Sequence, residues 1–109
     1  LIEAGPVFVN FTASWCITCK VNEITALGTR KVMEAFEFRG ITYLVADWSG
    51  EDPMITKALE GYGRAGVPLY LLFEKGSSKP TVLPQILTED IVLSALDKIG
   101  ASQLQKSNP

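Results

Sequence analysis

The two cysteines of the chain, Cys16 and Cys19, are separated by two residues and follow a segment with the pattern of a strand. That segment, residues 7–11, is apolar, β-branched or aromatic except at Asn10, and it predicts a buried strand. From Cys16 onward the apolar residues recur at helical spacing. A Cys-x-x-Cys sequence between a strand and a helix is typical of a redox site, because one helical turn brings the two sulfur atoms within bonding distance. The pair therefore restricts the chain to folds in which a strand leads directly into a helix.

The rest of the chain alternates between strand and helix patterns. Further strands are predicted at residues 41–46, 69–73 and 81–83. Three residues are placed to cap the helices that follow them: Thr29, Asp52 and Thr88. The first two strands must pair in parallel through a right-handed crossover, whereas the short turn at residues 75–80 makes the last two antiparallel. The sequence thus predicts an α/β fold, a mixed four-stranded sheet with helices on both faces.

Apolar spacing also predicts which helix faces are buried and where the domain ends. The expected core residues of the first two helices are Val21, Ile24, Leu27, Val32, Met33 and Phe36. Gly100 is expected to stop the last helix. We therefore predict a domain over residues 1–100, which starts with the end of a helix at residues 1–4, and a polar, frayed tail over residues 101–109.

Composition excludes several classes of site and partner. The 109 residues form one domain, and the absence of histidine excludes Cys-His and Ser-His-Asp catalysis and His-ligated metals. Two cysteines cannot supply a four-thiolate metal site. A net charge of -2 without a basic cluster argues against a nucleic-acid partner, and no apolar run approaches the ~20 residues of a membrane span. Because the chain starts at Leu1 without a signal-peptide pattern, we interpret it as an excised or processed domain, and we expect a monomer.

The position of each cysteine predicts its role. Cys16 lies at the expected N-terminus of a helix, where free N–H groups and the helix dipole stabilise a thiolate, so it is the predicted nucleophile. Cys19, one turn further on, is the predicted buried resolving thiol. A static disulfide is the first alternative, although so short a loop gains little chain entropy from being closed. A Cu(I) dithiolate site is the second, since two soft thiolates suit that ion.

Several segments resemble a known family. Residues 11–20 resemble the active-site segment of the thioredoxin superfamily, and Gly66-Val67-Pro68 resembles the cis-proline loop of that fold. A narrower resemblance runs from residue 5 to residue 100. Residues 19–23, 46–49, 66–70 and 82–88 are similar to the C-terminal periplasmic domain of DsbD-type thiol:disulfide interchange proteins, including their ScsB-like relatives.

This resemblance implies a protein-disulfide reductase relay with no cofactor beyond the Cys16–Cys19 pair. In such proteins the domain takes electrons from a membrane-embedded domain and passes them to an N-terminal domain of the same polypeptide, on the periplasmic side of the bacterial inner membrane. Val67 and Pro68 are the substrate-contacting residues that it implies, with a cis peptide bond before Pro68. Trp15 is a further candidate for contact with the partner, and the alternative for it is a simple packing role. A free-standing thioredoxin-like oxidoreductase is the alternative within the same class.

Three further polar residues bear on the predicted site. Glu23 follows Cys19 by four residues on the same helix face, where it could hold the proton of the resolving thiol or simply be a solvated carboxylate. Asn10 stands where many relatives carry a buried aspartate, which puts an acid–base role at that position in doubt. For Asp47 we favour a structural role at the end of a strand, before a helix cap.

Overall fold

A four-stranded sheet forms the centre of the computed structural model, which describes residues 5–107 and the side chains of residues 5–99. The strand order is β2-β1-β3-β4. The strands span Val7–Thr12 (β1), Thr42–Asp47 (β2), Leu69–Phe73 (β3) and Thr81–Val82 (β4). β1 pairs with β2 in parallel and with β3 antiparallel, and β3 pairs with β4 antiparallel. The predicted mixed sheet is confirmed, whereas the helix end expected at residues 1–4 lies outside the described residues.

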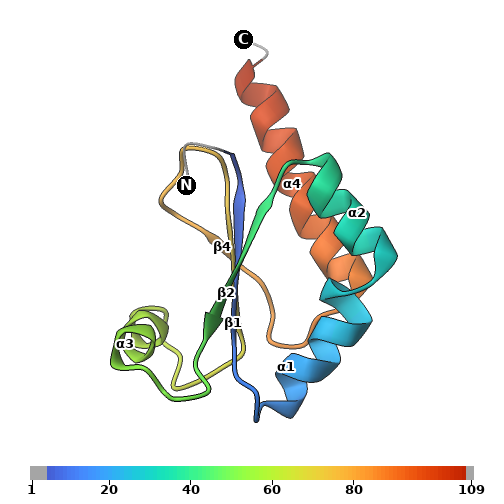
Figure 1. The fold of residues 1–109 in the computed structure, drawn as a ribbon. Coiled ribbons are helices and arrows are strands. Elements are labelled where there is room, and N and C mark those ends of the chain that lie inside the picture. Colours follow the sequence, from blue (N-terminus) through green and yellow to red (C-terminus); the bar gives the residue numbers. More distant parts are fainter. Residues whose placement is uncertain (1–4, 108–109) are drawn as a thin grey trace.

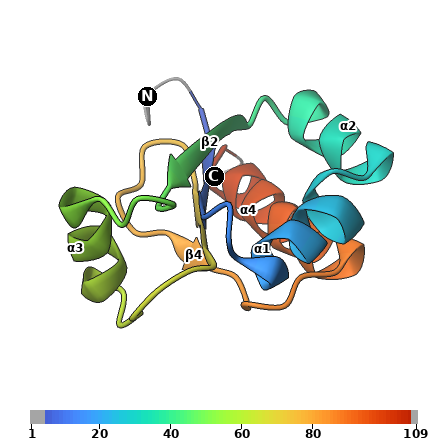
Figure 2. The same ribbon diagram turned by 60° about the horizontal axis from the view of Figure 1, so that its bottom comes forward.

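Helices cover both faces of this sheet, as predicted. They span Ile17–Asn22 (α1), Arg30–Phe38 (α2), Pro53–Gly61 (α3) and Glu89–Ser107 (α4), and a π-helix, η2, continues α1 over Glu23–Leu27. α1, α2 and α4 lie on one face and α3 alone on the other (Figure 1). The turned view shows the same two layers (Figure 2). None of the helices within residues 5–107 is long and apolar enough to span a bilayer.

The helix starts agree with the sequence, and one helix end does not. Side-chain oxygens of Thr29, Asp52 and Thr88 accept hydrogen bonds from backbone N–H groups in the first turns of α2, α3 and α4. The end expected at Gly100 is wrong, because α4 continues to Ser107. A single glycine costs a helix only about 1 kcal/mol relative to alanine, so it need not end one. The boundary between a domain and a tail at residue 100 stays a prediction.

The buried face of the first helix also differs from the prediction. Val21 is 50% and Ile24 73% exposed, and the buried residues are Cys19, Asn22, Ala26 and Leu27. The face of α1 that carries Cys19 is turned to the sheet, which leaves Val21 outside. Met33 is likewise exposed on α2, whereas Val32 and Phe36 are buried as expected.

Gly28 ends η2 at a point where the backbone makes a close approach. A Cβ atom at position 28 would clash with the backbone carbonyl oxygen of Glu23, so a side chain there would require the backbone to shift. Position 28 therefore needs glycine for space, although its φ of −97° is ordinary. The carbonyl of Glu23, the first residue of η2, therefore lies close to the backbone of Gly28, which follows the end of η2.

Alternation along β1 divides the core and points polar side chains toward the first helix. Phe8 faces the cluster under α2 and α4, and Phe11 faces the cluster with Trp48 and Leu59 under α3. Because side chains alternate along a strand, Asn10 and Thr12 share the face of Phe8. Both polar residues therefore point toward α1 and η2, near the end of the sheet where Cys16 lies.

Candidate active site

Cys16 and Cys19 form a disulfide at the N-terminus of α1. A turn closed by a 3.1 Å hydrogen bond from Cys16 N to Ala13 O connects β1 to this helix. Cys16 is the N-cap residue, and its Sγ accepts a hydrogen bond from Cys19 N at 3.1 Å. Cys16 is 8% exposed and Cys19 is fully buried. A partner can reach only the first sulfur, so the arrangement is suited to dithiol–disulfide exchange that starts at Cys16.

The loop before β3 forms a second wall beside the disulfide. The peptide bond between Val67 and Pro68 is cis, as the resemblance implied. Val67 packs against the small buried cluster of Ala13 and the two cysteines, and Pro68 is buried. Arg64 Nη1 donates a hydrogen bond to Pro68 O at 3.0 Å, which ties the loop to the end of α3. That these two residues contact substrate stays a prediction.

The two tryptophans lie together on the side of the site facing β2. Trp15 is half exposed, and its indole Nε1 donates a hydrogen bond to Ser49 O at 3.0 Å. Trp48 is buried, with its Nε1 bonded to Thr56 Oγ1 at 2.7 Å. The ring centroids are 5.7 Å apart. The buried indole of Trp48, held by its hydrogen bond to Thr56, therefore packs against the exposed indole of Trp15.

Glu23 belongs to a polar cluster between β1 and η2. Its Oε2 accepts hydrogen bonds from Thr12 Oγ1 at 2.7 Å and from Asn10 Nδ2 at 3.3 Å. Asn10 Nδ2 also donates to the hydroxyl of Tyr43 at 2.8 Å, and its buried Oδ1 has no partner among the described residues. Glu23 N donates to Cys19 O, so the same residue is also bonded to Cys19 through the backbone. This carboxylate is half-buried and hydrogen-bonded rather than freely solvated.

Two tyrosines near this cluster hold their protons unusually tightly. Burial is the main cause that raises the pKa of Tyr70, to about 12, and the negative charge of Glu23 adds to it. Burial also raises the pKa of Tyr43, with Glu23 acting in the same direction and the hydrogen bond with Asn10 opposing it. Both phenols are therefore neutral hydrogen-bonding groups under physiological conditions.

Asn22 is a buried residue of the site that the sequence interpretation missed. Its Nδ2 donates to Tyr70 OH and to Gln85 O, both at 2.8 Å, and its Oδ1 accepts from Leu87 N at 3.1 Å. These bonds fasten α1 to β3 and to the loop before α4. The available signal was its spacing, since Asn22 follows the buried Cys19 by one helical turn and so faces the sheet.

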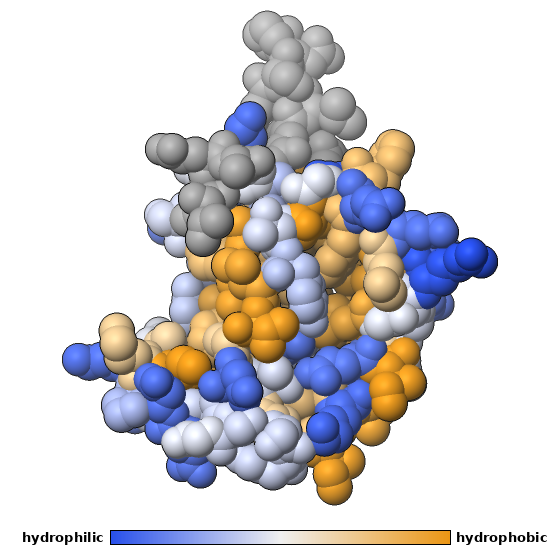
Figure 3. Space-filling model, viewed as in Figure 1, coloured by the Kyte–Doolittle hydropathy of each residue, from blue (hydrophilic) through white to orange (hydrophobic). Residues whose placement is uncertain are grey.

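Two surfaces adjoin the cysteines and Glu23. A groove of about 530 Å³ lies between η2, α2 and β2, lined by Glu23, Tyr43, Leu27 and Phe36 among others. Apolar side chains are also exposed along the first helix, and they gather over α1 at the lower end of the molecule in Figure 3. Within residues 5–99, no group of three or more Cys, Asp or Glu side chains is arranged to hold a metal ion.

Comparisons with known proteins agree with this geometry. A family model described as thioredoxin-like matches residues 3–75. The thiol:disulfide interchange protein DsbD of Campylobacter jejuni strain RM1221 is 27% identical over 88 residues, which are 80% of this chain but only 15% of that protein. The C-terminal domain of Neisseria meningitidis DsbD superposes in its reduced form with a TM-score of 0.69 at 23% identity, covering 88% of this chain and 82% of that one. Its oxidised form gives 0.66 at 25% identity, with 85% and 78% covered.

Proposed function

Because the chain belongs to the thioredoxin-like family, we propose that it is a protein-disulfide reductase relay domain, a thiol:disulfide oxidoreductase. The observation that carries the proposal is the Cys16–Cys19 disulfide at the start of α1, beside the cis Val67–Pro68 bond. The domain receives electrons from a membrane-embedded domain and passes them to periplasmic protein disulfides. Its partners are the transmembrane and N-terminal domains of a longer polypeptide on the periplasmic side of the inner membrane. The similarity to DsbD proteins supports this assignment.

Electron transfer to the partner takes two exchange steps. The Cys16 thiolate attacks one sulfur of the partner disulfide, so that a Cys16–partner bond forms while the partner S–S bond breaks and its other sulfur leaves as a thiolate. Cys19 then loses its proton and attacks Cys16 Sγ. The Cys16–Cys19 bond forms and the second partner sulfur leaves. The partner gains two electrons, and its two thiolates take up the two protons that the cysteines gave up.

Glu23 is the group that receives the Cys19 proton in the second step. Its carboxylate follows Cys19 by one helical turn and is held by Thr12 Oγ1 and Asn10 Nδ2. Because it also lines the groove between η2 and β2, it can exchange that proton with solvent without opening the site. Asn10 donates hydrogen bonds but cannot take a proton at neutral pH, and the neutral Tyr43 hydroxyl keeps its own, so Glu23 is the acceptor that this cluster offers.

Partner recognition takes place around Cys16. An extended segment of the partner pairs with the backbone at Val67 as an added strand, next to Pro68 and to the exposed ring of Trp15. This mode leaves sequence specificity low, because main-chain hydrogen bonds supply much of the affinity. Low sequence specificity suits a domain that must exchange disulfides first with an electron donor and then with an electron acceptor.

The proposal is tested by a redox titration against glutathione paired with a Cu(I) titration. We expect a reversible two-electron couple with a potential more reducing than about −180 mV, and no tight Cu(I) complex. The double variant Cys16→Ser/Cys19→Ser is the control that has no couple. A tight Cu(I) complex without a reversible couple would instead support a copper-binding module.

A further inference from the structure

The turn that delivers Cys16 to the helix is held by one residue of another loop. Its two central residues are Ser14 and Trp15, between Ala13 O and Cys16 N. Ser14 N donates a hydrogen bond to Ser49 Oγ at 2.7 Å, and Trp15 Nε1 donates to Ser49 O at 3.0 Å. Ser49 follows β2 and is separated from the turn by more than 30 residues of sequence. Both central residues of the turn therefore depend on Ser49.

Asp47 fixes the direction in which the Ser49 hydroxyl points. Asp47 Oδ1 accepts hydrogen bonds from Ser49 N at 2.9 Å and from Ser49 Oγ. These two bonds lower the pKa of the Asp47 carboxyl, which is therefore ionised and can only accept. A serine hydroxyl has one proton, and here it is committed to Asp47. Its lone pairs are then left facing the Ser14 N–H.

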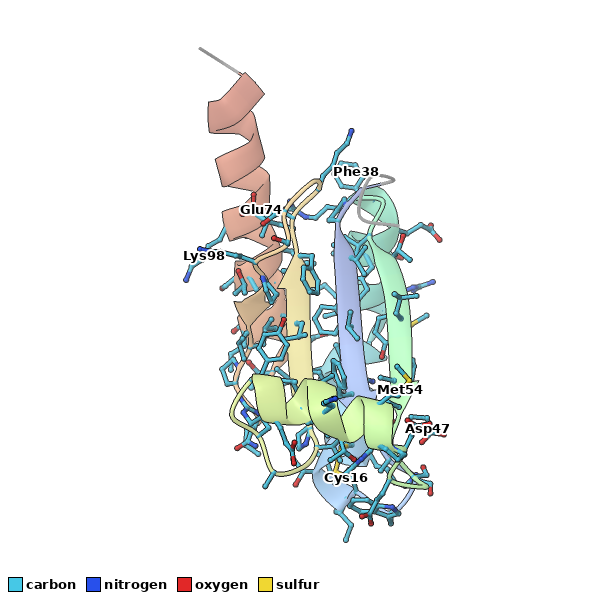
Figure 4. All side chains as sticks on the ribbon, turned by 90° about the vertical axis from the view of Figure 1, so that its left-hand side faces the viewer. Cys16, Phe38, Asp47, Met54, Glu74 and Lys98 are labelled. Carbon is cyan, nitrogen blue, oxygen red and sulfur yellow. A yellow bond between two sulfur atoms is a disulfide. The ribbon has the colours of Figure 1, made fainter. Side chains whose placement is uncertain are left out.

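The loop that carries Ser49 also touches the other wall of the site. Trp48 packs so closely on Gly66 that a Cβ at position 66 would lie 3.2 Å from the indole ring. The same indole supports the ring of Trp15. Figure 4 shows Asp47 at the same end of the sheet as Cys16. The loop that carries Trp48 and Ser49 thus contacts both the turn at Ser14 and Trp15 and the loop that leads to Val67 and Pro68.

We propose that Asp47 and Ser49 are positioning residues that hold Trp15 in place to receive a protein partner. The inference rests on the proposed function, since it assigns a device for docking to the same disulfide. Neither residue touches the sulfur atoms in this role. They act by keeping the turn between β1 and α1 in one geometry, so that the ring of Trp15 need not be ordered when the partner binds.

The test compares Ser49→Ala, which removes the hydroxyl acceptor, with Ser49→Thr, which keeps it. The substrate is insulin, as a disulfide-containing protein, and dithiothreitol is the small-thiol comparison. We expect Ser49→Ala to raise the KM for insulin about two- to tenfold, which is the fold-change that corresponds to the net free energy of one hydrogen bond. The kcat should stay within about twofold of the wild-type value. The rate of disulfide reduction by dithiothreitol should change less than about twofold. Ser49→Thr should restore the KM.

Hydrogen exchange at the Ser14 amide and the Trp15 indole reports whether the turn has been released. Asp47→Ala provides a second variant, at an exposed position, should Ser49→Ala fail to fold. The control is Glu51→Gln, which removes an exposed carboxylate of the same loop and should match the wild type. An unchanged KM in a Ser49→Ala domain whose Ser14 amide has lost protection overturns the inference alone. Failure of the wild-type domain to reduce insulin overturns the proposed function and this inference with it.

Discussion

The hydroxyl of Thr12 donates a 2.7 Å hydrogen bond to the carboxylate of Glu23, and this bond joins the last residue of β1 to the first residue of η2. Thr12 precedes Cys16 by four residues, and Glu23 follows Cys19 by four. The bond therefore links the segment before the disulfide to the segment after it. A charge held in this way acts on the thiols from a constant position, which makes its effect measurable.

Replacing Glu23 with glutamine should make Cys16 of the reduced domain react with an alkylating agent at lower pH. Removing a negative charge near the thiol favours the thiolate, and we expect the midpoint of the alkylation profile to fall by about half to one pH unit. The measurement is the alkylation rate as a function of pH. Glu37→Gln is the matched control, because Glu37 is exposed and lines the same groove. An unchanged midpoint would return Glu23 to a purely structural role.

The order of attack predicts which cysteine variant traps a partner. Cys19→Ser leaves the nucleophile without a resolving thiol, so a mixed disulfide with the partner should accumulate and be visible on a non-reducing gel. Cys16→Ser should give none, because Cys19 is fully buried. Equal trapping by both variants would contradict the assignment.

Loss of the Asn22 side chain should destabilise the domain strongly. Asn22→Ala leaves the buried Tyr70 hydroxyl and the backbone groups of Gln85 and Leu87 without their partner. We expect the free energy of unfolding to fall by about 2–4 kcal/mol, measured by urea denaturation. Thr25→Ala is the control, since Thr25 is exposed in η2, three residues further along the chain. A loss as small as that of the control would mean that water replaces the amide.

Alkaline pH should weaken the fold through Tyr70. Its pKa in the folded protein is about 12, against 10.0 for an ordinary tyrosine, so the unfolded chain loses this proton first. The stabilisation is complete below pH 10 and is lost as the pH rises toward 12. Urea denaturation across this range should show a falling free energy of unfolding, less steep in Tyr70→Phe. Tyr62→Phe, at an exposed position, should keep the wild-type slope.

Local signals in the sequence were sufficient for most of the fold. The four strands and the caps at Thr29, Asp52 and Thr88 depend on residues that are close in sequence, and the structure confirms them. The disulfide and the cis bond before Pro68 also agree with expectation. The rule that parallel strands need a crossover then left few topologies to choose from.

The errors arose where tertiary contacts override periodicity. Val21 and Ile24 are apolar and correctly spaced for a helix, yet the sheet accepts the face of Cys19 and Asn22 instead. An asparagine at a core position is disfavoured unless its hydrogen bonds are satisfied, and the partners of Asn22 lie 48 or more residues away. The bonds from Ser49 to Ser14 and Trp15 also join residues that are more than 30 positions apart. No local pattern contains such information.

The close approach of Gly28 to the carbonyl of Glu23 has a consequence for how this chain can vary by mutation. Every substitution at position 28 adds a Cβ where the carbonyl already lies, so the π-helical turn that carries Glu23 depends on glycine at this position. A library randomised at position 28 and selected for disulfide exchange should return glycine, whereas the same library at Gly50, where a Cβ meets open space, should return many residues. Variation at position 28 is thus limited by the Glu23 carbonyl, although Gly28 has no side chain of its own to contribute to the site.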